Sequence, residues 1–115
     1  MLRDKLFLLV PGFADPAYPD KTFYCWDCAL MEGVLASFPY LTNRIDVVRI
    51  AWPRPRQEVI DLVGEENQSL PVLVLADDAH ATLATGEHGG TRFVAGGEAI
   101  AAVLSQRHGL PERHP

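Results

Sequence analysis

The chain has 115 residues, of which 48% are hydrophobic and 22% charged, and its net charge is −5 at pH 7. This length and balance fit one globular domain, and the acidic charge argues against a general role in nucleic-acid binding. The longest apolar run, "LFLLV", is much shorter than the roughly 20 residues of a membrane span, and it is also shorter than a signal-peptide core. We therefore expect a cytoplasmic protein that has neither nucleic acid nor a membrane as a partner.

The first part of the chain predicts a strand, a loop and a helix, in that order. Residues 5–12 form an apolar run that ends at Pro-Gly, which is typical of a buried strand in a parallel sheet. Residues 13–24 are rich in Pro and Asp and have no period, so we expect a loop. A helix is expected to begin near Cys25 and to end before Pro39, because apolar residues recur on one side of it. This apolar face consists of Leu30, Met31, Val34, Leu35 and Phe38.

The middle of the chain predicts two strands and a helix between them. Residues 44–52 contain β-branched residues and predict the second strand. Residues 54–64 predict a helix, with Pro55 in its first turn and Gly64 as its C-cap. A third strand is expected at residues 71–76, and it is followed by a polar, glycine-containing connection.

The last part of the chain predicts a strand and a terminal helix. The polar connection extends over residues 77–90, and residues 91–96 predict the fourth strand. The helix at residues 97–109 ends at Gly109 and turns its apolar residues inward, namely Ile100, Val103 and Leu104. Residues 1–110 are therefore expected to form one domain, followed by a frayed tail at residues 111–115.

The predicted order is β-α-β-α-β-β-α, an α/β fold with a four-stranded mixed sheet flanked by three helices. The first three strands alternate with helices, so we expect them to pair in parallel with right-handed crossovers. No helix separates the third strand from the fourth, which favours an antiparallel hairpin.

Both cysteines of the chain lie in "FYCWDCALMEG", separated by two residues at the start of the first predicted helix. In a reducing compartment such a pair is more often catalytic or metal-binding than a structural disulfide. Cys25 would lie at the helix N-terminus, where unsatisfied N–H groups favour a thiolate. Cys28, one turn on and partly buried, is expected to have the higher pKa. This asymmetry suits an attacking thiol and a resolving thiol.

Three segments together resemble the thioredoxin fold and, within it, glutaredoxins and the N-terminal domains of glutathione transferases. They are "YCWDC" after the first strand, "SLPVLVL" at residues 69–75 and "RFVAGGEAIAAVL" at residues 92–104. The chain is also similar to a small family of uncharacterised bacterial thioredoxin-fold proteins. The resemblance spans about residues 5–109. It implies a thiol–disulfide oxidoreductase in which Cys25 attacks a disulfide and Cys28 resolves the mixed disulfide.

The resemblance also implies which residues surround the dithiol. It places a cis-proline, Pro71, opposite the two thiols, and it makes the backbone of Leu70 an edge for an extended peptide. In transferases, the turn before the last helix holds the γ-glutamyl group of glutathione through side chains, whereas this chain has Gly96 and Gly97 there, so only backbone N–H groups remain to hold a carboxylate. The substrate-binding residues implied are Trp26, Asp27, Leu70, Pro71, Gly96, Gly97 and Glu98.

The expected partner is a disulfide-bearing protein or a glutathionylated substrate, with no bound cofactor and with glutathione as the candidate reductant. Trp26 either faces the substrate or covers the dithiol. Asp27 either favours the first helical turn or opposes a thiolate on Cys25. Arg54 and Arg56, in "WPRPR", either meet a carboxylate of glutathione or of a peptide, or are solvated.

Two other functions remain open at this point. The long loop and the altered turn also suit a non-catalytic binding module with a thioredoxin-like fold. A metal-binding protein would use Cys25, Cys28 and a histidine, although a zinc site needs about four ligands and the chain has no further cysteine.

Overall fold

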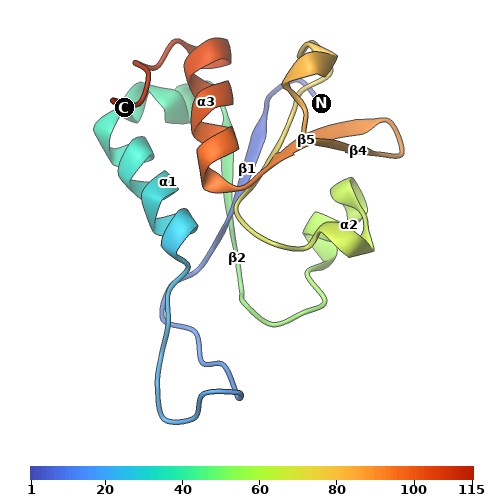
Figure 1. The fold of residues 1–115 in the computed structure, drawn as a ribbon. Coiled ribbons are helices and arrows are strands. Elements are labelled where there is room, and N and C mark those ends of the chain that lie inside the picture. Colours follow the sequence, from blue (N-terminus) through green and yellow to red (C-terminus); the bar gives the residue numbers. More distant parts are fainter.

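The structure, a computed structural model that describes residues 1–115, is an α/β domain with one mixed sheet and helices on both of its faces (Figure 1). The five strands are β1 (Lys5–Leu9), β2 (Asp46–Ile50), β3 (Val72–Val74), β4 (Gly86–His88) and β5 (Thr91–Ala95). They lie in the order β2-β1-β3-β5-β4. The three α-helices are α1 (Trp26–Ser37), α2 (Gln57–Val63) and α3 (Gly97–His108). None of them has both the length and the apolar composition that a membrane span requires.

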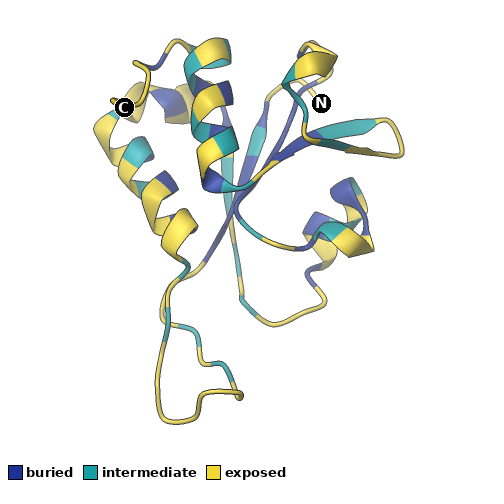
Figure 2. Ribbon diagram, viewed as in Figure 1, coloured by how far each residue is buried: buried dark blue, intermediate teal, exposed yellow.

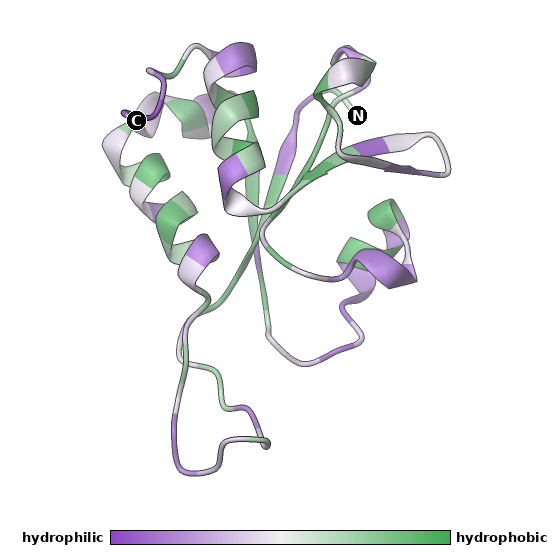
Figure 3. Ribbon diagram, viewed as in Figure 1, coloured by the Kyte–Doolittle hydropathy of each residue, from purple (hydrophilic) through white to green (hydrophobic).

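The strands divide their residues between two cores, because neighbouring side chains of a strand point to opposite faces of the sheet. α1 and α3 lie side by side on one face, where the larger core includes Leu6, Leu8 and Leu73. α2 covers the other face, where a smaller core includes Phe7 and Val72. Figure 2 shows that the buried positions follow the strands and the inner sides of the helices, and Figure 3 shows the same central strands as hydrophobic.

The pairing of the third predicted strand differs from the sequence prediction. β1 and β2 are parallel, as expected, but β3 runs antiparallel to β1, with Phe7 opposite Val72. β5 pairs with β3 in antiparallel register, as predicted. α2 has only 7 residues, about 10 Å of helix, and the chain then returns to the end of the sheet at which β2 finishes. The helix is therefore an excursion over one face and not a crossover, which the alternation of strands and helices does not reveal.

The sheet has five strands and not four, because the predicted irregular connection at residues 77–90 contains β4. Gly89 and Gly90, with φ of 54° and 83°, form the two-residue turn that joins β4 to β5. This kind of hairpin turn requires left-handed residues, and a Gly-Gly pair between two short segments is its sequence signal. β4 has no apolar alternation, since its Gly86 lies under the ring of Phe93 and its other residues are exposed. A hydrophobic pattern therefore does not indicate this strand.

The buried face of α1 also differs from the predicted one. Its buried residues are Cys28, Met31 and Leu35. Leu30, which leads the predicted face, is 49% exposed and lines a groove towards α3 together with Val34 and Phe38. The predicted set therefore combines two neighbouring stripes of one helix. α2 begins at Gln57, later than predicted, because Arg56 before it has non-helical backbone angles (φ −100°, ψ 82°), so Pro55 precedes the helix and is not in its first turn.

The predicted C-terminal ends of α2 and α3 are confirmed. α2 ends at Gly64 with φ of 90°, and α3 ends at Gly109 with φ of 73°. The inward residues of α3 are those predicted, Ile100, Val103 and Leu104. At Gly64 the positive φ and the close approach of the His88 ring both favour glycine, because a Cβ there would lie 2.8 Å from His88 Nδ1.

Residues 11–24 form a long loop that projects from the end of the sheet where α1 begins (Figure 1). Backbone hydrogen bonds between Phe13 and Phe23 close the base of this loop. The ring of Phe13 stacks on Trp52 in the connection after β2, at 5.5 Å between ring centroids. The two ends of the loop are therefore fixed next to each other, beside the start of α1.

A buried ionic cluster lies at the opposite end of the sheet. The Asp4 carboxylate is fully buried and accepts hydrogen bonds from Arg107 Nε and His108 Nε2, each at 2.7 Å. It also accepts the backbone N–H of Ala76 at 2.7 Å, and Arg107 donates to Asp78 as well. This cluster joins the start of β1, the end of β3 and the last turn of α3.

Replacing Asp4 by Asn is expected to lower the free energy of unfolding by about 2–4 kcal/mol, because the change removes the buried carboxylate to which the Arg107 guanidinium and the His108 ring both donate. Burial raises the pKa of the Asp4 carboxyl, but the hydrogen bonds from Arg107, Ala76 and His108 lower it more, so the net pKa lies below its ordinary value. The ionised group therefore stabilises the fold above about pH 4, and this contribution is lost as the pH falls through the lowered pKa.

Urea unfolding at a series of pH values between about 7 and 2 measures both effects. The wild type is expected to lose more stability than Asp4→Asn as the pH falls. Asp46→Asn is the matched control, because Asp46 is exposed and its ion pair with Arg3 is long, at 3.6 Å. This substitution should lower the free energy of unfolding by less than about 1 kcal/mol. Parallel pH profiles for the wild type and Asp4→Asn would contradict the assignment.

Candidate functional site

The first cysteine caps α1 with its own side chain. Cys25 has extended backbone angles (φ −79°, ψ 119°), and its sulfur accepts the backbone N–H of Cys28 at 3.1 Å. A residue in this position satisfies one of the N–H groups that a helix start leaves free. Negative charge on the sulfur is favoured there by the hydrogen bond and by the helix dipole. Cys25 is half-buried, in contrast to the buried Cys28.

The second cysteine lies beneath the first in the core. Cys28 is only 3% exposed, and its sulfur accepts the backbone N–H of Leu9 at 3.4 Å. Burial raises the pKa of the Cys28 thiol to about 12, with further contributions from the hydrogen bond and the charge of Cys25 and from the charge of Asp27. Both cysteines are free thiols in this structure. The predicted asymmetry is present, with one partly exposed cysteine and one buried thiol that holds its proton.

The segment before β3 faces the first cysteine. The Leu70–Pro71 peptide bond is cis, as the resemblance implied. The carbonyl oxygen of Leu70 lies 3.7 Å from Cys25 Sγ, within reach of its S–H. The carbonyl oxygen of Pro71 accepts the N–H of Gly96 at 3.3 Å, which ties the same segment to the start of α3.

Asp27 links the starts of the two long helices. Its Oδ2 accepts the backbone N–H of Gly97, the first residue of α3, over a long contact of 3.5 Å. A Cβ on Gly97 would lie 3.3 Å from the Cβ and Cγ of Asp27, so the glycine permits this close approach. Asp27 lies in the first turn of α1, as one sequence interpretation expected, and its contact with α3 is an additional role that the sequence did not indicate.

Two further residues predicted to bind substrate, Trp26 and Glu98, are both exposed. Trp26 is 76% exposed and lies beside Tyr24, itself 56% exposed, with 6.4 Å between the ring centroids. Trp26 therefore does not cover the dithiol. Glu98 is also exposed and pairs with Arg113 of the C-terminal tail at 3.6 Å, away from the two sulfurs.

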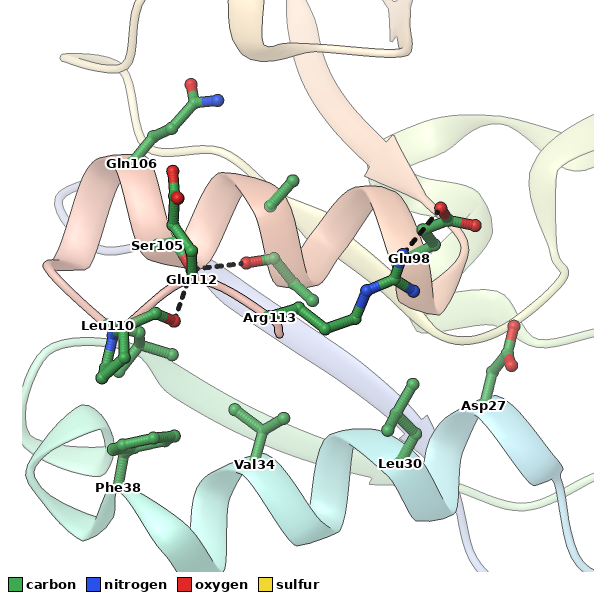
Figure 4. Close-up of a pocket in the computed structure, with 13 residues that line it drawn as sticks. Asp27, Leu30, Val34, Phe38, Glu98, Ser105, Gln106, Leu110, Glu112 and Arg113 are labelled. Atoms are coloured by element: carbon green, nitrogen blue, oxygen red, sulfur yellow. Dashed lines mark hydrogen bonds and ion pairs between the residues drawn. The ribbon is translucent and has the colours of Figure 1, made fainter. Parts of the chain in front are cut away.

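A groove of about 700 Å³ runs between α1 and α3 and is closed at one end by the C-terminal tail (Figure 4). Its apolar lining includes Leu30, Val34 and Phe38 from α1 and Leu110 from the tail. Asp27 lies at the end nearest the dithiol, but neither cysteine lines the groove. The groove therefore adjoins the dithiol site without containing it.

Arg56 is buried, whereas the sequence predicted an arginine that is either solvated or in contact with a ligand carboxylate. This side chain is only 6% exposed, so it is neither solvated nor open to a ligand carboxylate. Its Nε and Nη2 donate to the carbonyl of Trp52 at 3.0 and 2.6 Å, and its Nη1 donates to the carbonyl of Gln68 at 2.7 Å. The Gln68 side chain in turn accepts the Arg56 backbone N–H at 2.9 Å. No pattern in "WPRPR" distinguishes such a buried arginine from a solvated one, and Arg54, two residues earlier, is exposed.

No group of three or more His, Cys, Asp or Glu side chains comes together in a way that could hold a metal ion. His108, for example, bonds to Asp4 at the end of the sheet opposite to the cysteines. The metal-binding alternative therefore has no third ligand beside Cys25 and Cys28.

The chain belongs to the family described as "Protein of unknown function (DUF3088)", which matches residues 3–112. The match includes the dithiol, the Leu70–Pro71 segment and all of α3. Comparison with curated proteins and with solved structures found no significant match.

In the folded, reduced protein, iodoacetamide is expected to modify Cys25 at least about 100-fold faster than Cys28. A thiol with a pKa of about 12 has only about one molecule in ten thousand ionised at pH 8, and the thiolate is the reacting form. Mass spectrometry after limited labelling gives the two rates. In denaturant the two cysteines should react at similar rates, and equal labelling in the folded protein would contradict the assigned roles.

Proposed function

We propose that this protein is a glutaredoxin-like thiol–disulfide oxidoreductase on a thioredoxin-like fold. The observation that carries the proposal is the pair of sulfurs at the start of α1. Cys25 is partly exposed and its sulfur accepts a helix N–H, whereas Cys28 is buried one turn further along the helix. The proposed reductase acts in a reducing compartment such as the cytoplasm, where its dithiol is regenerated.

The fold supports this proposal through its order of elements. Without the edge strand β4, the chain follows β-α-β-α-β-β-α, the order that the resemblance implies. The central strands β2-β1-β3-β5 form a mixed sheet, and α1 starts at the end of β1. The Leu70–Pro71 segment faces Cys25, which supports the arrangement that the resemblance implies.

The reaction proceeds in two exchanges. The Cys25 thiolate attacks one sulfur of a substrate disulfide, which forms a mixed disulfide and releases the other substrate sulfur as a thiolate that takes up a proton. Cys28 then loses its proton and attacks the Cys25 sulfur, which releases the second substrate thiol and leaves a Cys25–Cys28 disulfide. The substrate gains two electrons and the dithiol loses two. A thiol such as glutathione, used as a free reductant, restores the dithiol.

The electrostatics of Cys28 fit its place as the second nucleophile. Burial is the main cause of its raised pKa, but the hydrogen bond and the negative charge of Cys25 add to it. Both of these contributions end when Cys25 is held in a neutral mixed disulfide. Cys28 therefore ionises more readily at the stage at which its attack is needed.

A protein disulfide is the substrate that the surroundings of Cys25 favour. The Leu70 carbonyl offers a backbone acceptor to an extended peptide, and the exposed rings of Tyr24 and Trp26 provide apolar contact beside the sulfur. The N–H of Gly97, which a carboxylate of glutathione would otherwise use, already faces Asp27. Glutathione mixed disulfides are therefore proposed to be the poorer substrates.

Cys28→Ser is expected to accumulate a covalent adduct with a disulfide-containing peptide, because the first exchange proceeds and the second cannot. Cys25→Ser should form no adduct and should reduce the disulfide at least about 100-fold more slowly than the wild type. Mass spectrometry before and after treatment with a reductant identifies the adduct. An absence of both adduct and wild-type turnover would overturn the proposal.

A non-catalytic binding module is the second candidate, and the exposed aromatic pair Tyr24 and Trp26 is the observation in its favour. Purification of the protein together with a bound partner distinguishes the two functions. A partner retained by the variant that lacks both thiols, and lost by Trp26→Ala, would support the binding module. A partner released by reductant would support the oxidoreductase.

Asp27→Ala is expected to raise the rate with a glutathione mixed disulfide about fivefold, because it frees the Gly97 N–H and removes a negative charge from the site. The rate with a peptide disulfide should change by less than about twofold. Asp27→Asn removes the charge but keeps an acceptor next to Gly97, so a smaller gain is expected. Unchanged preference between the two substrates in Asp27→Ala would show that Asp27 does not select the substrate.

A further inference from the structure

Arg56 is the one buried cationic side chain of the chain, and it has no acidic partner. The single buried acid, Asp4, is paired with Arg107 and His108, whereas Arg56 forms no ion pair and bonds only to backbone carbonyls. These carbonyls satisfy its donors but provide no net negative charge. Since an unpaired buried charge is unfavourable, the surroundings of Arg56 are expected to contain an anion in the working state of the protein.

The contacts of Arg56 lead to the dithiol from two sides. Gln68, which binds both its backbone and its guanidinium, lies two residues before Leu70, whose carbonyl faces the Cys25 sulfur. Trp52, which accepts from the same guanidinium, stacks on Phe13 at the base of the loop that leads to Cys25. The guanidinium is thus bound to the two backbone segments that lead, through Leu70 and through Phe13, to the first cysteine.

The charged and titratable groups around Cys25 come from several segments. On α1 they are Cys28, which holds its proton, and Asp27, which faces the start of α3. Before α2 they are the exposed Arg54 and the buried Arg56. The segment before β3 presents only the backbone of Leu70 to the sulfur. At the start of α3, the Glu98 carboxylate is exposed and pairs with Arg113, and Lys21 in the loop is exposed.

We propose that Arg56 is a positioning residue, the buried countercharge that stabilises the thiolate of Cys25. It acts on the sulfur through its electric field and touches neither the substrate nor the reacting atoms. Because the guanidinium is shielded from water and fixed by three hydrogen bonds, its charge acts in a medium of lower dielectric constant than that of an exposed arginine. Burial and the charge of Arg54 lower the pKa of Arg56 below its ordinary value, whereas the charges of Cys28 and Cys25 raise it, which agrees with an electrostatic interaction between Arg56 and the two cysteines.

The inference rests on the proposed function only in taking Cys25 as the reactive sulfur. Its test uses alkylation, which needs neither a disulfide substrate nor turnover, so its failure is distinguishable from a failure of the oxidoreductase proposal. All variants are made in Cys28→Ser, so that a single thiol reacts. The rate of alkylation of Cys25 by iodoacetamide is measured against pH at low salt.

Arg56→Met is expected to move the midpoint of the pH–rate profile upward by about one pH unit, so that the rate well below the midpoint falls about tenfold. Arg54→Met is the matched control, because it removes the same charge from an exposed side chain two residues away, and it should move the midpoint by less than about 0.3 unit. An unchanged midpoint in Arg56→Met, or an equal shift in Arg54→Met, would overturn the proposal.

Arg56→Lys keeps the test decisive if Arg56→Met does not fold, as judged by circular dichroism. Lysine keeps the charge but lacks the planar fork that binds the carbonyls of Trp52 and Gln68, so this variant should be less stable than the parent. Its midpoint is expected to stay within about 0.5 unit of the parent. A structural role alone would lower stability and leave the pH profile independent of charge, and a folded Arg56→Lys with a midpoint raised by about one unit would overturn the proposal.

Discussion

The site depends on one interaction, the hydrogen bond from the Cys28 N–H to the Cys25 sulfur that defines where α1 begins. This bond places the first sulfur at the end of the helix dipole and, one turn later, turns the second sulfur into the core against Leu9. α1 has a fixed starting point because three segments meet there. Cys25 faces Leu70, Pro71 bonds to the start of α3, and the start of α3 returns to α1 through Asp27. A shift of any one of these segments would therefore displace the Cys25 sulfur.

The two ends of the sheet contain buried charges in opposite situations. At one end the Asp4 carboxylate pairs with the Arg107 guanidinium, accepts a hydrogen bond from His108 and joins three elements, so it serves stability. At the other end the Arg56 guanidinium has only carbonyl partners, next to a site with ionisable sulfurs. A fully compensated charge is what a structural cluster requires. An uncompensated charge is more often found at a functional site, and here the proposed thiolate of Cys25 would provide the missing negative charge before the reaction begins.

Sequence patterns predict that three helices and the first two strands exist and that both cysteines lie at the start of α1, because these features depend on local periodicity and on residue type. They fail where the outcome depends on distant contacts. The direction of β3 follows from how far α2 extends before the chain turns back, and β4 is held by Phe93 and a Gly-Gly turn and not by apolar residues of its own. Leu30 and Met31 have similar hydrophobicity, and only the packing of α1 on the sheet makes one exposed and the other buried. The burial of Arg56 depends on carbonyls at residues 52 and 68, which no local pattern connects.

The loop at residues 11–24 enters and leaves the fold at almost the same point, because Phe13 and Phe23 bond to each other at its base. Lengthening or shortening the tip of such a loop changes only a small entropy of closure, since that entropy varies with the logarithm of loop length. Neither β1 nor α1 has to move when the tip changes. Members of the family can therefore diverge in this loop, and so in the surface that they present beside the first cysteine, while the geometry of the two sulfurs stays the same.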